Sequence, residues 1–248
     1  MKVENYKNFL EEFSKDIKFD YELKKKTWFN IGGRAKVFYK AENLKELVNF
    51  LKKINNEEKI FILGAGSNTL ITDNFFDGIV IKLGNTFNNI SLLGEDVIIA
   101  GSGVLDKALS NFAIDNGLGG FEFLSGIPGT VGGGIKMNAG CFGSEFKDIL
   151  ISIQAIDKLG NIITIPKKDI NFEYRNNNLS DDLIYLSASF KGIKAQIKDI
   201  KNKTLRLRKE KEKNQPTRIK TSGSTFKNPI SQTNKKVWEL IKESVPLT

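Results

Sequence analysis

A glycine-rich stretch in the middle of the chain limits what the chain can fold into more than any other feature. Residues 126–134 contain five glycines and one proline. Glycine is a poor helix former, so the sequence predicts that this run is not a helix. Glycine also lets another group approach the main chain closely. We therefore expect a stretch of bare backbone that holds a ligand, with Gly132, Gly133 and Gly134 allowing close packing.

A second, shorter glycine loop follows an apolar run. The sequence LGAGSNTL at 63–70 comes directly after the apolar residues 60–62, which is typical of a strand that enters a turn. The N–H groups of such a turn can converge on an anion such as a diphosphate. Taken alone, the loop fits an ordinary tight turn equally well, and it lacks the GxGxxG spacing of a Rossmann fold. Two such loops together favour a large cofactor that carries phosphate.

The residue types that are missing restrict the chemistry. The chain has 248 residues, no histidine and a single cysteine. Histidine is therefore excluded as a base, and a zinc site is not expected. Other side chains must do the acid–base work, or a cofactor must carry the difficult step. We expect Cys141 to pack against its neighbours.

The charge of the chain does not indicate a nucleic-acid partner, because a general skew toward Lys, Asn, Ile and Phe explains it without any binding role, and a small anionic substrate fits it equally well. The formal net charge is +9, but basic and acidic residues are mostly interleaved. The one basic block, residues 201–213, has no aromatic residues on which bases could stack. No apolar run is long enough to span a membrane, and the N-terminus does not resemble a secretory signal. We expect a cytoplasmic protein that binds no nucleic acid or membrane and needs no protein partner.

Hydrophobic periodicity predicts an α+β fold, since strands and helices mix without strict alternation. Asn43 is a candidate N-cap, Gly117 a candidate helix end, and Leu105, Leu109 and Phe112 are expected to face inward. Helices are expected at 4–17, from 44 to 51, 104–116, 194–213 and 235–243, and strands at 36–40, 60–63, 79–83, 97–100, 151–156, 162–165 and 183–190.

Several motifs, taken in order, resemble a known family. They are IGGRA at 31–35, LGAGSNTL at 63–70, GLGGFEFLSGIPGTVGGGIKMNAGCFG at 117–143, YR at 174–175 and SGSTFKNP at 222–229. Together they resemble the UDP-N-acetylenolpyruvoylglucosamine reductases. The resemblance implies an N-terminal helix (1–20), an FAD-binding region of the vanillyl-alcohol-oxidase type with two subdomains (21–193), a connecting helix (194–213) and the start of an α+β substrate-binding domain (214–248).

The resemblance also implies a reaction. NADPH would reduce FAD, and the flavin would pass a hydride to the enolpyruvyl ether of a UDP-sugar, a step of peptidoglycan precursor synthesis. Arg175 would stabilise the enolate-like charge, and Ser224 would donate the proton. Tyr174 and Asn228 would contact the substrate, and Arg218 and Lys220 would meet its diphosphate. No metal is implied.

The resemblance places the flavin against both glycine loops. Backbone N–H groups would hold its diphosphate, and residues after the second loop would line its ring. The implied cofactor-binding residues are Gly64, Ala65, Gly66, Ser67, Asn68, Thr69, Leu70, Ser125, Gly126, Ile127, Pro128, Gly129, Thr130, Asn138, Ala139 and Gly140.

The chain departs from the family near its end. The third catalytic residue of the family is a glutamate that would lie beyond residue 248, so we expect a truncated chain that binds FAD and turns the substrate over poorly. Two alternatives stay open, a flavin-binding fragment without catalysis and an FAD-dependent oxidase of the same fold. Covalent flavin attachment in such oxidases commonly uses histidine, which this chain lacks.

Overall fold

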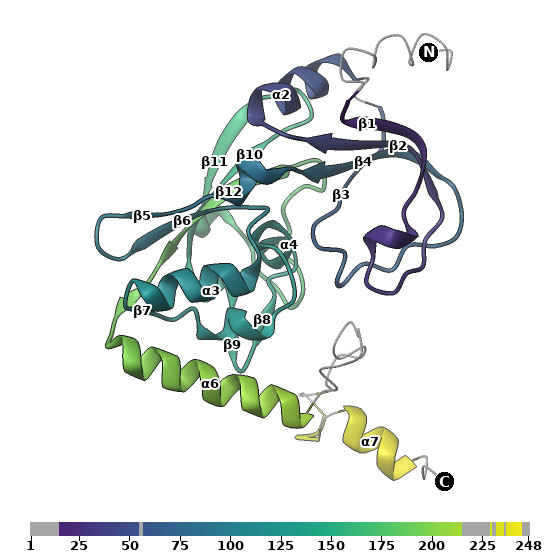
Figure 1. Cartoon of the computed structure of the whole chain (residues 1–248). Coiled ribbons are helices and arrows are strands. Elements are labelled where there is room, and N and C mark those ends of the chain that lie inside the picture. The colour runs from purple at the N-terminus through teal and green to yellow at the C-terminus, as the bar shows by residue number, and fades with distance from the viewer. Residues whose placement is uncertain (1–14, 55–56, 215–228, 230–231, 236, 245–248) are drawn as a thin grey trace.

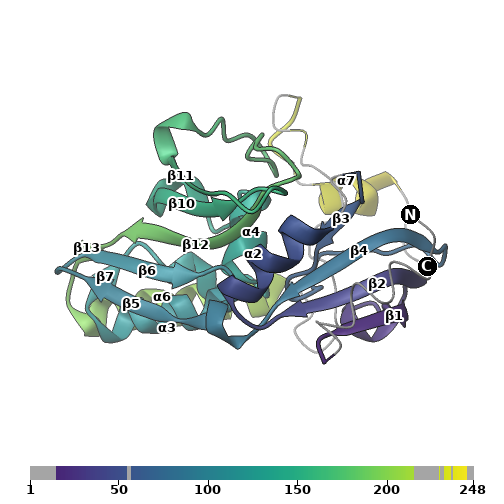
Figure 2. The ribbon, with the colours of Figure 1, turned by 90° about the horizontal axis from the view of Figure 1, so that it is seen from above.

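Two β-sheets form the frame of the molecule in a computed structural model that describes residues 15–54, 57–214, 229, 232–235 and 237–244 (Figures 1 and 2). The first sheet has the order β1-β2-β4-β3. In it β2, β4 and β3 run parallel, and β1 is antiparallel to β2. The strands are β1 (Ile17–Glu22), β2 (Arg34–Ala41), β3 (Ile60–Ile62) and β4 (Phe76–Leu83).

The second sheet is antiparallel throughout and has the order β11-β10-β12-β6-β5. Two short two-stranded pairs, β13-β7 and β8-β9, accompany it. The strands are β5 (Ile90–Leu93), β6 (Val97–Gly101), β7 (Leu118–Gly119), β8 (Gly140–Cys141), β9 (Ser144–Glu145), β10 (Leu150–Ile156), β11 (Ile162–Pro166), β12 (Ile184–Lys191) and β13 (Ile193–Lys194).

The helices lie between and outside the sheets (Figure 1). The α-helices are α2 (Leu44–Lys53), α3 (Asp106–Asp115), α4 (Val131–Lys136), α5 (Phe146–Ile149), α6 (Ile197–Asn214) and α7 (Val237–Ser244). Short 3₁₀ turns occur at η2 (Lys24–Lys26), η3 (Asn85–Asn88), η4 (Glu122–Gly126) and η5 (Lys167–Asp169). None of the described helices is long and apolar enough to cross a membrane.

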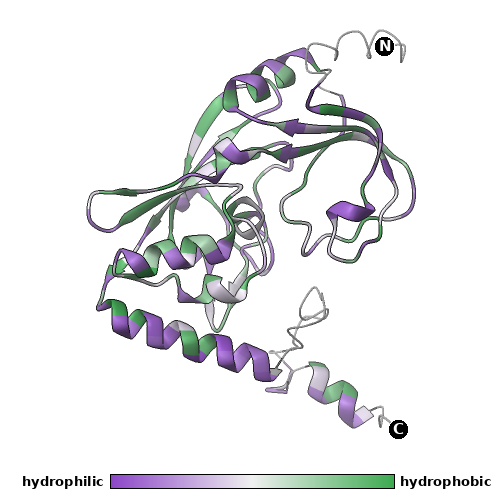
Figure 3. Cartoon of the chain, in the orientation of Figure 1, coloured by the Kyte–Doolittle hydropathy of each residue, from purple (hydrophilic) through white to green (hydrophobic). Residues whose placement is uncertain are grey.

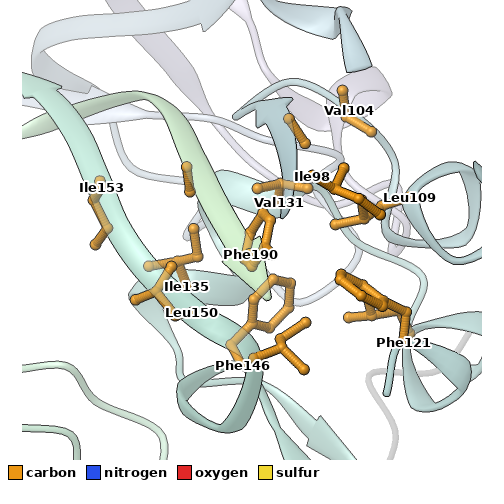
Figure 4. Close-up of a cluster of buried hydrophobic side chains, with 14 of the residues drawn as sticks. Ile98, Val104, Leu109, Phe121, Val131, Ile135, Phe146, Leu150, Ile153 and Phe190 are labelled. Atoms are coloured by element: carbon orange, nitrogen blue, oxygen red, sulfur yellow. The ribbon is translucent and has the colours of Figure 1, made fainter. Parts of the chain in front are cut away.

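The largest core joins the second sheet to α3, η4, α4 and α5. Phe146 packs there against Phe123 and Phe190, with ring centroids about 6 Å apart in both pairs. Figure 4 shows Phe146 and Phe190 in this core. A second core joins the two sheets, because Ile156 of β10 and Ile184 and Leu186 of β12 pack with α2, β2 and β4. This shared core fixes one sheet against the other.

Helix α6 runs beside α3 and is polar on much of its surface (Figures 1 and 3). Lys203 forms an ion pair with the buried carboxylate of Glu122 at 3.2 Å. Lys211 donates a hydrogen bond to the carbonyl oxygen of Gly126. Both contacts tie α6 to η4, so the helix is attached to the glycine-rich segment.

Most of the predicted elements are confirmed. The structure has mixed α+β architecture, and each predicted strand is present to within a few residues. Asn43 caps α2, since its side-chain oxygen accepts a hydrogen bond from the Glu46 N–H at 3.0 Å. Gly117 follows α3 with a φ of +67°, a conformation that favours glycine.

The prediction that the glycine-rich run is not helical was wrong at its end. Residues 131–136, with the sequence VGGGIK, form α4. Tertiary packing overrides the poor propensity here, because Val131 and Ile135 are fully buried. A Cβ on Gly134 would overlap the ring of Phe146, and one on Gly132 would lie 2.9 Å from the Ser102 Cβ. The close-packing role expected for these two glycines is confirmed.

Two further expectations need correction. Leu105 does not face inward; it lies before α3 with 56% of its surface exposed, because the helix begins at Asp106, two residues after its predicted start. Of the helix expected at 4–17, residues 4–14 fall outside the described residues. Residues 15–16 form a turn and Ile17 opens β1, so the expected helix does not reach its predicted end.

Candidate active site

The two glycine loops meet in space. The first, residues 63–70, follows β3, and the second, residues 125–130, connects η4 to α4. A Cβ added to Gly64 would lie 2.7 Å from the hydroxyl oxygen of Thr130. Such a distance is too short for a real Cβ, so only glycine lets the loops approach this closely.

Both loops offer free backbone donors at this junction. In the described part of the chain, the N–H groups of Ala65, Gly66 and Ser67 donate to no other group, and the same holds for Gly129 and Thr130. Free N–H groups on converging loops are what a diphosphate needs. The junction therefore fits the phosphate portion of a dinucleotide cofactor.

The side chains of the loop residues divide by burial. Ser67 and Thr130 are buried, whereas Leu70 has 71% of its surface exposed. The Ser125 hydroxyl donates to the Glu122 carbonyl oxygen at 2.7 Å, so it stabilises η4. Ala65, Thr69, Ile127 and Gly129 are half-buried, and Asn68 and Pro128 are exposed.

Asn138 is a structural connector. It is 1% exposed, and its φ is +38°. Its amide nitrogen donates to the Glu145 carboxylate at 2.9 Å and to the Glu173 carbonyl at 3.2 Å, and its oxygen accepts from the Lys147 N–H at 3.1 Å. These bonds attach the chain segment after α4 to the turn that contains Arg175.

Tyr174 and Arg175 occupy the middle of a tight turn. Glu173 and Asn176 close it, with N–H to carbonyl bonds of 2.9 and 3.4 Å. Arg175 has a φ of +61°, which is uncommon for a residue with a side chain. The guanidinium carbon lies 5.4 Å from the centroid of the half-exposed Tyr174 ring. The turn thus presents an arginine and an aromatic ring together.

Cys141 packs beside Gly126 of the second glycine loop, as expected. A Cβ on Gly126 would lie 3.2 Å from the Cys141 sulfur and 3.6 Å from Cδ of Lys211. Burial raises the pKa of the Cys141 thiol; the charges of Lys211 and, more weakly, Arg175 lower it in part, and that of Glu210 raises it.

Four predicted residues fall outside the described residues, namely Ser224, Asn228, Arg218 and Lys220. Within the described ranges, no group of three or more His, Cys, Asp or Glu side chains could hold a metal ion. A surface hollow of about 380 Å³ between α3 and α6, lined by Asn111 and Lys201 among others, includes none of the predicted residues. The glycine loops are the better candidate site, because unpaired N–H groups of both loops meet there among the described residues, and the Arg175 turn is linked through Asn138 to the segment after α4.

Comparison with known proteins accounts for this arrangement. Residues 35–166 match a family described as an FAD binding domain, and this range contains both glycine loops. The UDP-N-acetylenolpyruvoylglucosamine reductase of Pelagibacter ubique is 63% identical over 247 residues, which is 100% of this chain and 82% of that protein. The chain belongs to the UDP-N-acetylenolpyruvoylglucosamine reductase family.

Other members of the reductase family are also similar to this chain over most of its length. The protein of that name from Rickettsia typhi is 45% identical over 229 residues, covering 92% of this chain and 76% of that one. The crystal structure of the reductase from Thermus caldophilus superimposes with a TM-score of 0.78 at 30% identity, covering 92% of this chain and 79% of that one. The chain is thus shorter than these relatives, and it is an FAD-dependent oxidoreductase of this family.

A more distant structure shares only the fold. An alkyldihydroxyacetonephosphate synthase superimposes with a TM-score of 0.54 at 12% identity, covering 76% of this chain and 40% of that one. The oxidoreductase assignment therefore comes from the reductase family and from the FAD binding domain, which also confirms the fold type predicted from the motifs.

Sequence reasoning missed two polar residues beside the site, the half-buried Lys82 and the buried Asp106. The Lys82 ammonium donates to the Gly64 carbonyl oxygen at 2.8 Å. Asp106 is fully buried, and its backbone N–H donates to the Gly129 carbonyl at 3.1 Å. Lys82 could have been noticed as a lysine at the end of an apolar strand. Asp106 gave no signal, because an acidic residue at a helix start is usually solvated.

Proposed function

We propose that this chain reduces the enolpyruvyl ether of UDP-N-acetylglucosamine to UDP-N-acetylmuramate, with FAD as hydride carrier and NADPH as reductant. The step belongs to peptidoglycan precursor synthesis. The observation that carries the proposal is the meeting of Gly64 with Thr130, which brings two sets of free N–H groups together. Membership of the reductase family supplies the substrate class.

The proposed division of labour follows from the residue types. When bound, FAD supplies hydride transfer. The chain's own residues hold the cofactor diphosphate at the two loops and orient the substrate. The planar guanidinium of Arg175 suits the enolpyruvyl carboxylate and offsets negative charge that develops on it. By resemblance, the Ser224 hydroxyl then donates a proton to the neighbouring carbon.

The backbone of Arg175 supports its role. A positive φ costs roughly 1–3 kcal/mol for a residue with a side chain. The turn keeps this conformation through the bonds of Glu173 and Asn176 and the attachment to Asn138. Strain of this kind is found at functional sites, where it fixes the direction of a side chain. We therefore propose Arg175 as the residue that meets the substrate anion.

The remaining assignments are proposals as well. We propose an FAD-binding region over 21–193 and a substrate-binding segment that begins at 214. Tyr174 and Asn228 would contact the substrate, and residues 138–140 would border the flavin ring. We further propose a cytoplasmic location, with no nucleic acid, membrane or obligate protein partner.

Anaerobic flavin spectroscopy tests the proposal. The purified chain is titrated with FAD, reduced with NADPH and then mixed with the enolpyruvyl UDP-sugar. We expect FAD binding, bleaching of the flavin band, and return of the band upon addition of the sugar. Return of the band with oxygen but not with the sugar would favour an oxidase, and FAD binding without bleaching would favour a fragment that only binds. Either result contradicts the proposed function.

Two variants of Arg175 test its proposed role in the same experiment. Arg175→Gln should bind FAD as the unaltered chain does, because Arg175 lies outside both glycine loops. Its reoxidation by the enolpyruvyl UDP-sugar should slow by about 10²–10³-fold, since a charge-stabilising group is lost. Arg175→Lys keeps the charge without the planar fork and should be intermediate. Equal rates in all three proteins would remove Arg175 from the mechanism.

A further inference from the structure

Lys82 lies where the parallel strands of the first sheet end. Ile81, the residue before it, pairs with Ile62 of β3, and the chain then leaves β3 into the first glycine loop. Ligands in parallel sheets bind outside the carboxyl ends of the strands. From this edge the Lys82 ammonium reaches the loop and donates to the Gly64 carbonyl oxygen at 2.8 Å. The lysine is therefore attached to the loop that meets Thr130.

No carboxylate of the described part of the chain compensates the charge of Lys82. Other half-buried lysines do have acidic partners, for example Lys36 with Glu58 at 3.1 Å and Lys136 with Asp181 at 2.7 Å. Among the described residues, Lys82 bonds to the neutral carbonyl of Gly64 alone, which uses one of its three N–H donors.

Neighbouring lysines add to the positive potential. Lys40 lies opposite Lys82 in the register of β2 and β4, and its ammonium pairs with Glu42. Lys26 lies 5.8 Å from the ring centroid of Tyr21 and has no acidic partner in the described ranges. Burial first, and then the charges of Lys26 and Lys40, lower the pKa of Lys82.

A half-buried cation without a counter-charge is costly unless an anion joins it. No carboxylate of the described residues supplies that anion, whereas the free N–H groups of the adjoining loop point to a phosphate ligand. We propose that Lys82 is a further ligand of the cofactor diphosphate, acting as a point charge beside the backbone donors of the two glycine loops. The inference rests on the proposed function, because it takes FAD as the occupant.

Charge and hydrogen bonding can be separated at this position. Lys82→Gln removes the charge but retains an N–H donor, and Lys82→Arg retains the charge. Lys40→Gln is the matched control, since it removes a lysine at the paired position on the neighbouring strand whose charge Glu42 already balances. FAD affinity is measured by quenching of flavin fluorescence at two salt concentrations, and thermal unfolding without FAD checks that each variant folds.

We expect Lys82→Gln to weaken FAD binding by about 10- to 100-fold, with Lys82→Arg within about 5-fold and Lys40→Gln within about 2-fold of the unaltered chain. The affinity of the unaltered chain should fall with added salt, and that of Lys82→Gln should fall less. If the unaltered chain binds FAD and Lys82→Gln binds it equally well, the inference fails and the proposed function stands. If the unaltered chain does not bind FAD at all, both fail together.

Discussion

Gly64 lies directly against the Thr130 hydroxyl, although 66 positions separate the two residues in the sequence. The contact joins the loop after β3 of the first sheet to the loop before α4, which packs in the core of the second. Each loop alone is a common turn, but together they bring free N–H groups of both to one place. The contact therefore forms one candidate site from two loops, one from each sheet's side of the molecule.

Gly64→Ala should separate the loops. The new Cβ would lie 2.7 Å from the Thr130 hydroxyl oxygen, but 3.9 Å from its Cβ. Overpacking of this kind costs about 1–3 kcal/mol, so we expect FAD affinity to fall about 10-fold or more. Thr130→Ala alone should change affinity little. The double variant should recover most of the loss, because the clashing oxygen is gone; a double variant as weak as Gly64→Ala would show that contact with Thr130 is not the cause.

Two adjacent glycines of α4 should respond in opposite ways to alanine. A Cβ on Gly134 would overlap the Phe146 ring, whereas one on Gly133 would meet only the Thr130 hydroxyl oxygen at 3.5 Å. We expect Gly134→Ala to lower the free energy of unfolding by about 1–3 kcal/mol. Gly133→Ala should raise it by up to about 1 kcal/mol, because alanine is the better helix former. Urea unfolding without FAD measures both, and equal effects would contradict the packing account.

The contrast between these glycines shows what the sequence could reveal about the fold. Periodic patterns predicted the strands and the larger helices, because period and capping are local properties. The helix of α4 was not predictable from propensity, because it depends on Phe146 and Ser102, which are distant in the sequence. Leu105 was misplaced for a smaller reason, because α3 begins two residues later than predicted.

The sequence predicted those parts of the candidate site that the backbone forms. Glycine spacing marked both loops, and the YR motif marked the Arg175 turn. The side-chain environment was not predictable, because the burial of Lys82 and Asp106 depends on how the loops pack. The strained φ of Arg175 likewise depends on the bonds of Glu173 and Asn176. Ser224 and Asn228 stay predictions from the resemblance.

Asn177 should control the position of the Arg175 turn. It is fully buried, and its amide nitrogen donates to the Tyr185 hydroxyl at 2.8 Å and to the Ile135 carbonyl at 3.2 Å. Asn177→Ala would leave these acceptors unsatisfied, which costs about 1–3 kcal/mol in the free energy of unfolding. We expect weaker binding of the enolpyruvyl UDP-sugar, with FAD affinity unchanged. Asn171→Ala is the control, because the Asn171 side chain is exposed and makes no hydrogen bond in the described part of the chain. An equal loss in both variants would contradict this role.

Asp106 should make stability depend on pH. Its side chain is fully buried, and in the described part of the chain neither carboxyl oxygen has a hydrogen-bond partner. Burial raises the pKa of this carboxyl well above its usual range, and no neighbouring charge contributes. The folded protein therefore holds the proton at pH values where the unfolded chain, with a pKa of about 3.9, has released it.

The direction in which stability changes with pH follows from this difference in bound protons. Where the unfolded chain binds fewer protons, stability falls as the pH rises, from about pH 4 until the folded-state pKa is passed. Asp106→Asn cannot ionise, so it should match the unaltered chain near pH 4 and exceed it by about 1–3 kcal/mol at pH 8. Ser110→Ala removes another buried polar atom that has no hydrogen-bond partner among the described residues, one turn further along α3, and should change stability equally at both pH values. Thermal unfolding across this range measures the effect. A constant difference between Asp106→Asn and the unaltered chain would mean that Asp106 does not titrate in the folded state.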